Sequence, residues 1–156
     1  MNAVNGLGAK TALEHLIFLS GRNIIEICRT FTITPQQFSD WIKKRRPIPA
    51  ERLTQLANYF GVGEAMLADE ARFAKGLSAL TAVELELITV KNRAKLSVSA
   101  EEQSELKYHE QRLLEQYQNQ LRIARLSALL DGNNPAVMAK IDKFLNEMEN
   151  DYGTHV

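Results

Sequence analysis

Signals that start and stop helices follow one another closely through the first half of this chain, and they restrict it to short helices. Thr11 is followed three residues later by Glu14, and Asn23 is followed in the same way by Glu26. In this spacing the two side chains cap backbone N–H groups in the first turn of a helix. Apolar residues then recur every three or four positions, which is the helical period. The pattern predicts one helix after Thr11 and a second after Asn23.

Proline and glycine residues divide the next segment in a similar way. Pro35 follows Thr34, and proline is favoured at a first helical position because its missing N–H is not needed there. That helix should end before Pro47, and Pro49 should open another that ends at Gly61. The sequence "GEAMLAD" then predicts one more short helix. Five short helices are therefore expected in the first half of the chain.

The second half predicts longer helices. Thr81 with Glu84 has capping-box spacing and should open the first of them. A long helix is expected from Ser99 to about Leu130, and Pro135 should open the last one. No stretch alternates between apolar and polar residues as a strand does. The sequence therefore predicts an all-α fold.

Charge is distributed unevenly along the chain, although the formal net charge is zero. Residues 1–53 contain eight Lys or Arg and four Asp or Glu, whereas residues 54–156 contain eleven and fifteen. The zero net charge argues against a uniformly basic nucleic-acid coat protein. The asymmetry between the halves indicates two different tasks.

Residue types that carry catalysis or metal binding are sparse. The single cysteine, Cys28, excludes an internal disulfide, and the three histidines have no spacing that makes a metal site. A phosphate-cradling glycine loop and a nucleophile–base pair are both absent from the sequence, so we expect no enzyme activity and no cofactor. No apolar run reaches the roughly 18 residues of a membrane span, and the N-terminus lacks a signal-peptide pattern. We expect a soluble cytoplasmic protein.

The segment "TITPQQFSDWIKKRRPIP", Thr32 to Pro49, combines polar side chains, aromatic side chains and a run of cations. A short helix fits the DNA major groove when side chains near its N-terminus reach base edges. The residues on that face are predicted base contacts: Thr34, Gln36, Gln37 and Asp40. The opposite face, Phe38, Trp41 and Ile42, should anchor the helix to a core. The cations at its end, together with Asn23, are predicted phosphate contacts: Lys43, Lys44, Arg45 and Arg46.

Residues 23–67 resemble the Cro/lambda-repressor-like, or XRE-type, helix-turn-helix family, and the first helix extends the resemblance to about residues 11–68. Ile27-Cys28 stands for the family's Leu-Ala, and Thr32-Ile33-Thr34 stands for its Gly-Val-Ser. The family's Ile-Ser-x-Trp is matched by Phe38, Ser39 and Trp41, and its fourth helix by "LTQLANYFGV". The resemblance implies a five-helix DNA-binding domain over residues 1–70.

The chain departs from the family pattern at several positions. Ile24 replaces a glutamine that in the family helps to hold a phosphate. Thr32 replaces the turn glycine, which the turn tolerates if Thr32 avoids the left-handed region. Ile42 and Lys44 replace the glutamate and glycine that follow the tryptophan. These changes indicate a divergent member of the family.

Residues 78–156 are predicted to form a helical oligomerisation or interaction domain. The long amphipathic helix and the last helix carry apolar residues in seams, and one monomer is not expected to bury all of them. Three alternatives are open: a homodimer, a docking surface for another protein, and a plain intramolecular bundle. The homodimer is favoured because pairing two half-sites raises specificity for an operator. The predicted contact residues are Leu114, Tyr117, Leu121, Ile141, Phe144 and Leu145.

The predicted function is therefore sequence-specific binding of double-stranded DNA by a transcriptional regulator. A repressor of phage or mobile-element type, bound as a dimer to a palindromic operator, fits the resemblance best. The alternative is a protein-interaction module, such as an antirepressor, adaptor or antitoxin, whose helix-turn-helix binds a partner protein.

Overall fold

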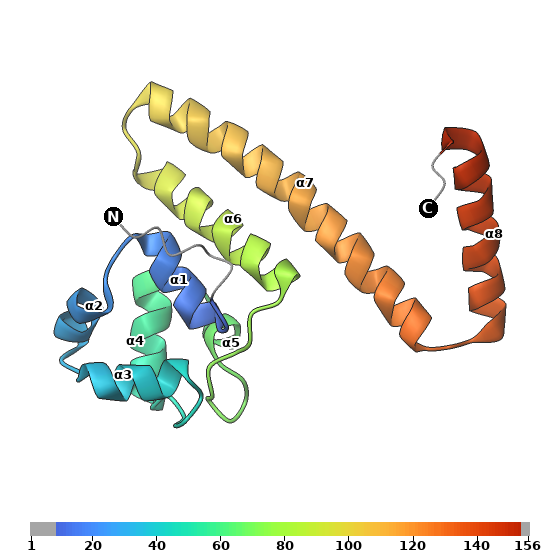
Figure 1. Cartoon of the computed structure of the whole chain (residues 1–156). Helices are drawn as coiled ribbons and strands as arrows, with labels where there is room; N and C mark the ends of the chain where they lie inside the picture. Colours follow the sequence, from blue (N-terminus) through green and yellow to red (C-terminus); the bar gives the residue numbers. More distant parts are fainter. Residues whose placement is uncertain (1–8, 154–156) are drawn as a thin grey trace. The chain divides into compact units, whose positions relative to one another are not determined.

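Helices make up nearly all of the regular structure in the part of the chain that the computed structural model describes, residues 9–153 (Figure 1). No strand occurs in these residues, and two isolated bridges, Thr11 with Gly76 and Ala68 with Ala74, are their only β-type pairings. The all-α prediction is confirmed. Within the same residues no helix is both long enough and apolar enough to cross a membrane. The helices are α1 Ala12–Ser20, α2 Ile24–Phe31, α3 Pro35–Ile42, α4 Ala50–Phe60, α5 Glu64–Leu67, α6 Ala79–Leu96, α7 Ala100–Asp131 and α8 Pro135–Tyr152.

The first three helices begin where their capping residues predict. Thr11 and Glu14 form a complete capping box at α1, and Asn23 and Glu26 form one at α2. Each box satisfies backbone N–H groups that have no partner inside the helix. At α3 the cap is Thr34, whose side chain accepts a hydrogen bond from the Gln37 N–H. These three starts are confirmed.

The main core gathers side chains from α1 to α6. Its largest fully buried members include Phe38 of α3, Leu56 of α4 and Leu85 of α6. Cys28 of α2 is also buried there, and this burial raises the pKa of its thiol. Five short helices cannot each bury an apolar stripe alone, so they share one core.

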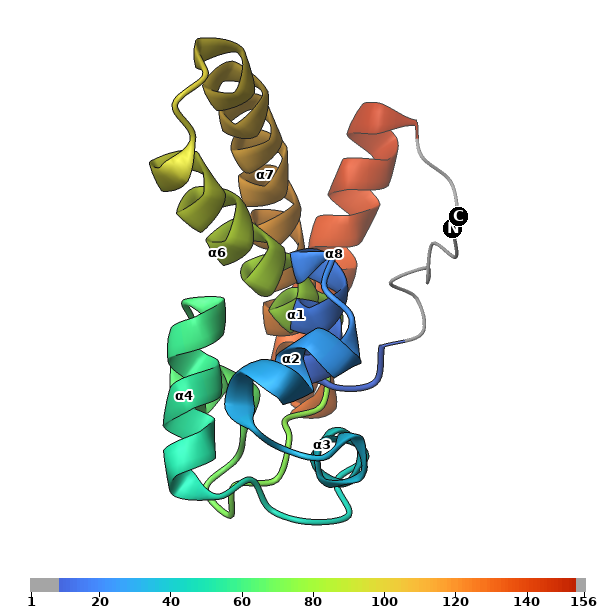
Figure 2. The ribbon, with the colours of Figure 1, turned by 90° about the vertical axis from the view of Figure 1, so that its left-hand side faces the viewer.

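Helix α6 packs on two partners at once. Leu85 joins the main core, whereas Leu87 and Val90 form a second core with Leu106 and Leu113 of α7. Both ribbon views show α6 alongside the first half of α7 (Figures 1 and 2). Because α6 buries residues on two faces, it holds the first part of α7 to the helices before it.

Backbone hydrogen bonds tie the segment before α6 to the start of α1. The Ala12 N–H donates to the Lys75 carbonyl at 3.0 Å, and the Leu77 N–H donates to the Lys10 carbonyl at 3.1 Å. Farther along, the Asn92 side chain donates to the Gly61 carbonyl at 3.2 Å, which joins α6 to the end of α4. Residues 75–77 are thus part of the packed structure and not a linker.

One predicted helix boundary is wrong in detail. The cap of α6 is Ser78, whose hydroxyl accepts from the Thr81 N–H at 3.1 Å, so Thr81 lies inside the helix. Ser78 is a good cap in its own right, and it places Leu80 inside the first turn. Helix α7 ends at Asp131, close to the predicted Leu130, and the left-handed residue after it is Asn133, with φ 45°. Asparagine tolerates this conformation better than most residues with a Cβ.

The chain divides into two compact units, one ending at Tyr117 and one starting at Gln118. This division falls within α7, whereas the sequence placed the boundary between residues 70 and 78. The physical reason is that α6 and the first half of α7 complete the cores of the first unit. The outermost residues of the expected domains, 1–8 and 154–156, lie outside the described residues.

The second unit contains the end of α7 and the whole of α8. Helix α8 starts at the predicted place, with the Asn134 side chain accepting from the Ala136 N–H at 3.0 Å and Pro135 in the first turn. None of its described residues is buried. Its apolar residues are only half-buried or exposed, so the unit has no closed core of its own.

Candidate nucleic-acid interface

Helix α3 presents one buried face and one exposed face. Phe38 is fully buried, Trp41 is 6% exposed, and Ile42 is buried beside them. The rings of Phe38 and Trp41 meet edge to face with their centroids 6.1 Å apart. The predicted anchoring face is confirmed, and it directs the polar residues of α3 outward. Within the first unit, α3 lies at the end away from the α6–α7 connection (Figures 1 and 2).

Thr34 and Gln37 cap the helix with each other's side chains. The Gln37 side-chain oxygen accepts from the Thr34 N–H at 3.0 Å and from the Thr34 hydroxyl at 3.2 Å. The Gln37 N–H donates to the Thr34 hydroxyl oxygen at 3.2 Å. Both side chains are exposed, and the Gln37 amide nitrogen carries two further donor hydrogens at the surface. The sequence identified the Thr34 cap but not this second partner.

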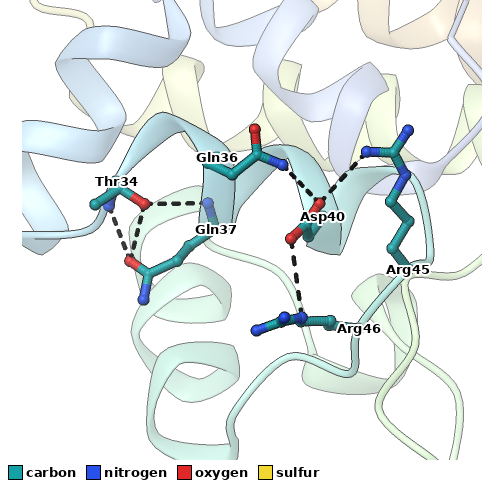
Figure 3. A network of polar contacts seen from close by, with 6 residues as sticks. All are labelled: Thr34, Gln36, Gln37, Asp40, Arg45 and Arg46. Carbon is teal, nitrogen blue, oxygen red and sulfur yellow. Dashed lines mark hydrogen bonds and ion pairs between the residues drawn. The ribbon is translucent and has the colours of Figure 1, made fainter.

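Asp40 holds three polar side chains of the same surface together. Its Oδ1 accepts from Gln36 Nε2 at 2.9 Å and lies 3.6 Å from an Arg45 guanidinium nitrogen, and its Oδ2 lies 3.9 Å from Arg46 Nε (Figure 3). The side chain of Asp40 is only 15% exposed. The Arg45 and Arg46 N–H groups also donate to the Asp40 carbonyl, at 2.8 and 3.3 Å. Asp40, which the sequence predicted as a base contact, therefore also orders the side chains around it.

Four consecutive cations continue from the end of α3. Lys43, Lys44, Arg45 and Arg46 are all exposed. Between Thr34 and Pro49 the only carboxylate is that of Asp40, so this segment carries a net charge of +3. A concentrated positive charge beside exposed amide side chains suits a polyanion that also presents hydrogen-bonding groups.

The two turns that flank α3 both contain a residue with positive φ. Thr32, after α2, has φ 52° and ψ 48°, and Lys44, after α3, has φ 57°. The condition under which the turn was expected to tolerate the loss of glycine is therefore not met, because Thr32 lies in the left-handed region. Its N–H donates to the carbonyl of Arg29, and the Ile33 N–H donates to the carbonyl of Cys28 at 3.0 Å. These bonds close the end of α2 and keep Thr32 in the left-handed conformation.

No family model matches the chain, and neither a curated protein nor a solved structure matches it.

The start of α2 exposes two apolar side chains. Asn23 is exposed and its side-chain oxygen accepts from the Glu26 N–H at 2.9 Å, so this predicted phosphate contact serves as a helix cap. Ile24 is 41% exposed and Ile25 is 56% exposed. An exposed isoleucine pair is unusual for a helix N-terminus that faces a charged ligand.

An open pocket of about 680 Å³ lies between the end of α2 and α4, and the sequence did not predict it. A guanidinium nitrogen of Arg52 donates at 2.8 Å both to the Phe31 carbonyl and to Gln55 Oε1. Phe31 is far from Arg52 in the sequence, so no local spacing signals this bond. The pocket is lined by Thr30, Phe31, Thr32, Arg52, Gln55, Asn58 and Tyr59.

The residues predicted for oligomerisation lie along α7 and α8. Leu114 is exposed, whereas Tyr117 and Leu121 are half-buried. In α8, Ile141 is half-buried, Phe144 is 56% exposed and Leu145 is 46% exposed. Among the described residues, no three His, Cys, Asp or Glu side chains come together as metal ligands.

Proposed function

We propose that this chain is a sequence-specific DNA-binding transcriptional regulator, a repressor of phage or mobile-element type that uses α3 to read the major groove. The observation that carries the proposal is the exposed face of α3. There, Gln36 and two arginines are held by one carboxylate beside two exposed lysines. Glutamine can pair with adenine through two hydrogen bonds, and arginine and lysine bind phosphates.

Asp40 gives this surface its order before any ligand arrives. Long polar side chains lose rotamer freedom when they bind, and this loss weakens binding. Gln36 and the two arginines already share one partner, which restricts them in advance. When DNA is bound, Arg45 and Arg46 can exchange a weak surface ion pair for a phosphate at small cost, because exposed ion pairs contribute little.

The two positive φ angles support the resemblance to the XRE-type family. Thr32 and Lys44 stand where that family has glycine, and glycine is the residue that adopts this conformation without strain. The backbone keeps the left-handed turns although the side chains have changed. Five helices within Ala12–Leu67, with Phe38 and Trp41 in the core, fit the same family architecture.

The decisive experiment selects bound sequences from a random duplex pool and then measures affinity against salt. We expect Gln36→Ala to weaken the preferred site by about 1–3 kcal/mol and to relax preference at one position. We expect Lys44→Ala to weaken all sequences alike and to reduce the salt slope by about one unit. Lys95→Ala, which removes an exposed cation from α6, is the matched control and should leave the slope unchanged. Absence of any enriched sequence, with a salt slope equal in all variants, would reject the proposal.

Asp40→Asn separates the two roles of this carboxylate. If Asp40 acts mainly by ordering Gln36, Arg45 and Arg46, its neutralisation should weaken binding to the preferred site, whereas the rise in net charge of the segment from +3 to +4 should strengthen binding to random duplex DNA. If it also accepts a hydrogen bond from a cytosine amine, the selected sequences should lose their preference at one position. Equilibrium binding to random and selected duplexes at matched salt measures both effects.

A second candidate function is a protein-interaction module, such as an antirepressor, adaptor or antitoxin. The observation in its favour is the exposed pair Ile24 and Ile25, because Ile24 occupies the place of the family's phosphate-holding glutamine. Exposed apolar groups next to a binding surface usually mark a protein partner. Binding to random duplex DNA distinguishes the two candidates, since a protein-interaction module lacks the steep salt dependence of DNA binding.

A further inference from the structure

The second unit leaves most of its apolar side chains without a partner. On the part of α7 after Tyr117, the large apolar side chains that remain exposed are Ile123, Leu126, Leu129 and Leu130. On α8, Phe144, Leu145 and Tyr152 are exposed, and no residue of this helix is buried. Two helices with this much apolar surface in water are unfavourable, at about 25 cal/mol for each Å² of apolar area.

The unit that contains α8 is short. Gln118–Val156 is about as long as the roughly 40 residues below which a chain usually needs a metal, disulfides or oligomerisation to fold. The only cysteine lies elsewhere, at Cys28, and the described residues hold no cluster of metal ligands. A second copy of this unit would supply the apolar surface that α8 lacks.

The apolar stripe of α8 follows a heptad pattern that is wider than a two-helix seam. Val137, Ile141, Phe144 and Met148 occupy its two central positions, spaced by three and four residues. A third apolar row lies along one flank of this seam and consists of Met138, Leu145 and Tyr152. A stripe with three apolar rows is typical of a helix in a bundle, where it contacts more than one neighbour.

The other flank of the stripe carries opposite charges. Lys140 and Glu147 lie seven residues apart, and seven residues are close to two helical turns, so both side chains project from the same flank. In an antiparallel pair of identical helices, each flank faces the same flank of its partner. Lys140 of one copy then faces Glu147 of the other, and the two-fold axis passes close to Phe144. In a parallel pair this flank would instead face the apolar row.

We propose that α8 pairs antiparallel with α8 of a second copy of this chain, with Phe144 at the two-fold axis and Lys140–Glu147 ion pairs on both sides of it. The apolar row that contains Leu145 then faces the ends of the two α7 helices. The result is a four-helix bundle with two helices from each copy. A two-fold dimer is the simplest closed arrangement, because the same patch serves both partners.

Charge supports a second copy over an unrelated partner. Gln118–Gly153 contains four cations and five carboxylates, so the unit has almost no net charge and needs no oppositely charged partner. The intrahelical ion pair between Lys143 and Glu147, at 3.8 Å, lies on highly exposed side chains and competes only weakly. The charges of the Lys140 flank are complementary to themselves in the antiparallel orientation.

A dimer of this kind would let the proposed regulator bind two half-sites, and the inference rests on the proposed function only for this use. The association itself requires no DNA. A dimer that ignores DNA would reject the proposed function and leave the inference intact, whereas a monomer that binds one half-site would do the reverse.

The first test is the mass of the full-length protein by sedimentation equilibrium at tens of micromolar, without DNA. We expect a dimer. Phe144→Ser should weaken association at least tenfold, because it removes the apolar side chain at the axis. Tyr108→Ser is the matched control, since Tyr108 is an exposed aromatic residue of α7 in the first unit. Fluorescence of the single tryptophan, Trp41, reports whether the first unit stays folded in each variant. A monomeric wild-type protein would overturn the inference.

Charge reversal tests the orientation. Lys140→Glu and Glu147→Lys should each weaken the homodimer, by about tenfold, because each change turns two attractions into two repulsions. The double variant, and an equimolar mixture of the two single variants, should both recover the wild-type constant to within about threefold. Asn146→Glu adds a charge on the exposed side of α8 opposite the seam and should have little effect. Failure of both the double variant and the mixture to recover would overturn the antiparallel arrangement.

Discussion

Replacement of Thr32 by glycine should make the first unit more stable, although it removes a whole side chain. Thr32 has φ 52° and ψ 48°, and its side chain is exposed. For an L-residue the left-handed helical conformation costs about 1–2 kcal/mol, and β-branched residues are especially rare there. Glycine escapes this cost because it has no Cβ.

The unfolded chain offsets part of the gain. Glycine has more conformational freedom than threonine when unfolded, and this freedom opposes folding by about 0.4–1 kcal/mol. The difference leaves Thr32→Gly more stable by about 0.5–1 kcal/mol. For a domain of this size the midpoint of thermal unfolding should rise by roughly 2–5 °C.

Urea and thermal unfolding followed by Trp41 fluorescence measure the effect, because the single tryptophan lies in the core of the first unit. Gly21→Ala is the matched control. Gly21 ends α1 at φ 65°, and a Cβ there meets no atom within 4 Å, so the change tests backbone conformation alone. It should destabilise the unit by about 1 kcal/mol. A lower midpoint for Thr32→Gly would refute the argument from strain.

Three further predictions concern other parts of the first unit. Trp41→Ala should destabilise the unit by about 3–5 kcal/mol in urea unfolding followed by circular dichroism, and native stability with lost DNA binding would instead place the ring on DNA. A chain ending at Gly76 lacks α6 and should fail to fold cooperatively, whereas a chain ending at Tyr117 should unfold in one transition. The same cooperative unfolding in both chains would contradict the role of α6 in the core. The Ser97 hydroxyl donates to the Glu102 carboxylate at 2.7 Å and lowers the pKa of Glu102, and the Arg93 guanidinium adds to this effect. The contact therefore stabilises the fold above the ordinary glutamate pKa, and this stabilisation is lost as pH falls through the pKa of the folded state. Ser97→Ala should raise that pKa in an NMR titration, and an unchanged pKa would show that the hydroxyl is not its main cause.

The starts of helices could be predicted from the sequence because their causes are local. A capping box needs only two side chains three residues apart, and the boxes at Thr11 and Asn23 form as the spacing indicates. The same rule failed at Thr81, because Ser78 offered an equally good cap slightly earlier. Where two capping residues lie within one turn of each other, the packing of the following helix determines which of them caps it. That packing depends on distant residues, so the local sequence does not predict it.

The contacts that join distant segments could not be predicted in this way. Leu106 and Leu113 of α7 form one core with Leu87 and Val90 of α6, and no local spacing in the sequence indicates this pairing. Helix α6 carries apolar residues on more than one face, so its sequence pattern does not show which of them face the first five helices and which face α7. The extent of the first unit therefore became clear only from the folded structure.

In the candidate site, too, the features with local causes could be predicted from the sequence and the others could not. The buried and exposed faces of α3 follow from helical spacing, and Phe38 and Trp41 lie where that spacing puts them. The role of Asp40 does not follow, because its bonds to Arg45 and Arg46 depend on how the chain turns after α3. The left-handed conformation of Thr32 could not be predicted either, because the hydrogen bonds at the end of α2 determine it and the threonine side chain disfavours it.

The packing of α6 against α1 has a consequence for synthesis. A ribosome adds about 5–20 residues per second, so α6 is made several seconds after α1. Until Leu85 is available, the core that it shares with Leu13 and Leu16 of α1 lacks one of its fully buried members. The nascent chain therefore cannot complete its first core when the fifth helix is finished, and the last part of that core forms only after α6 has left the ribosome.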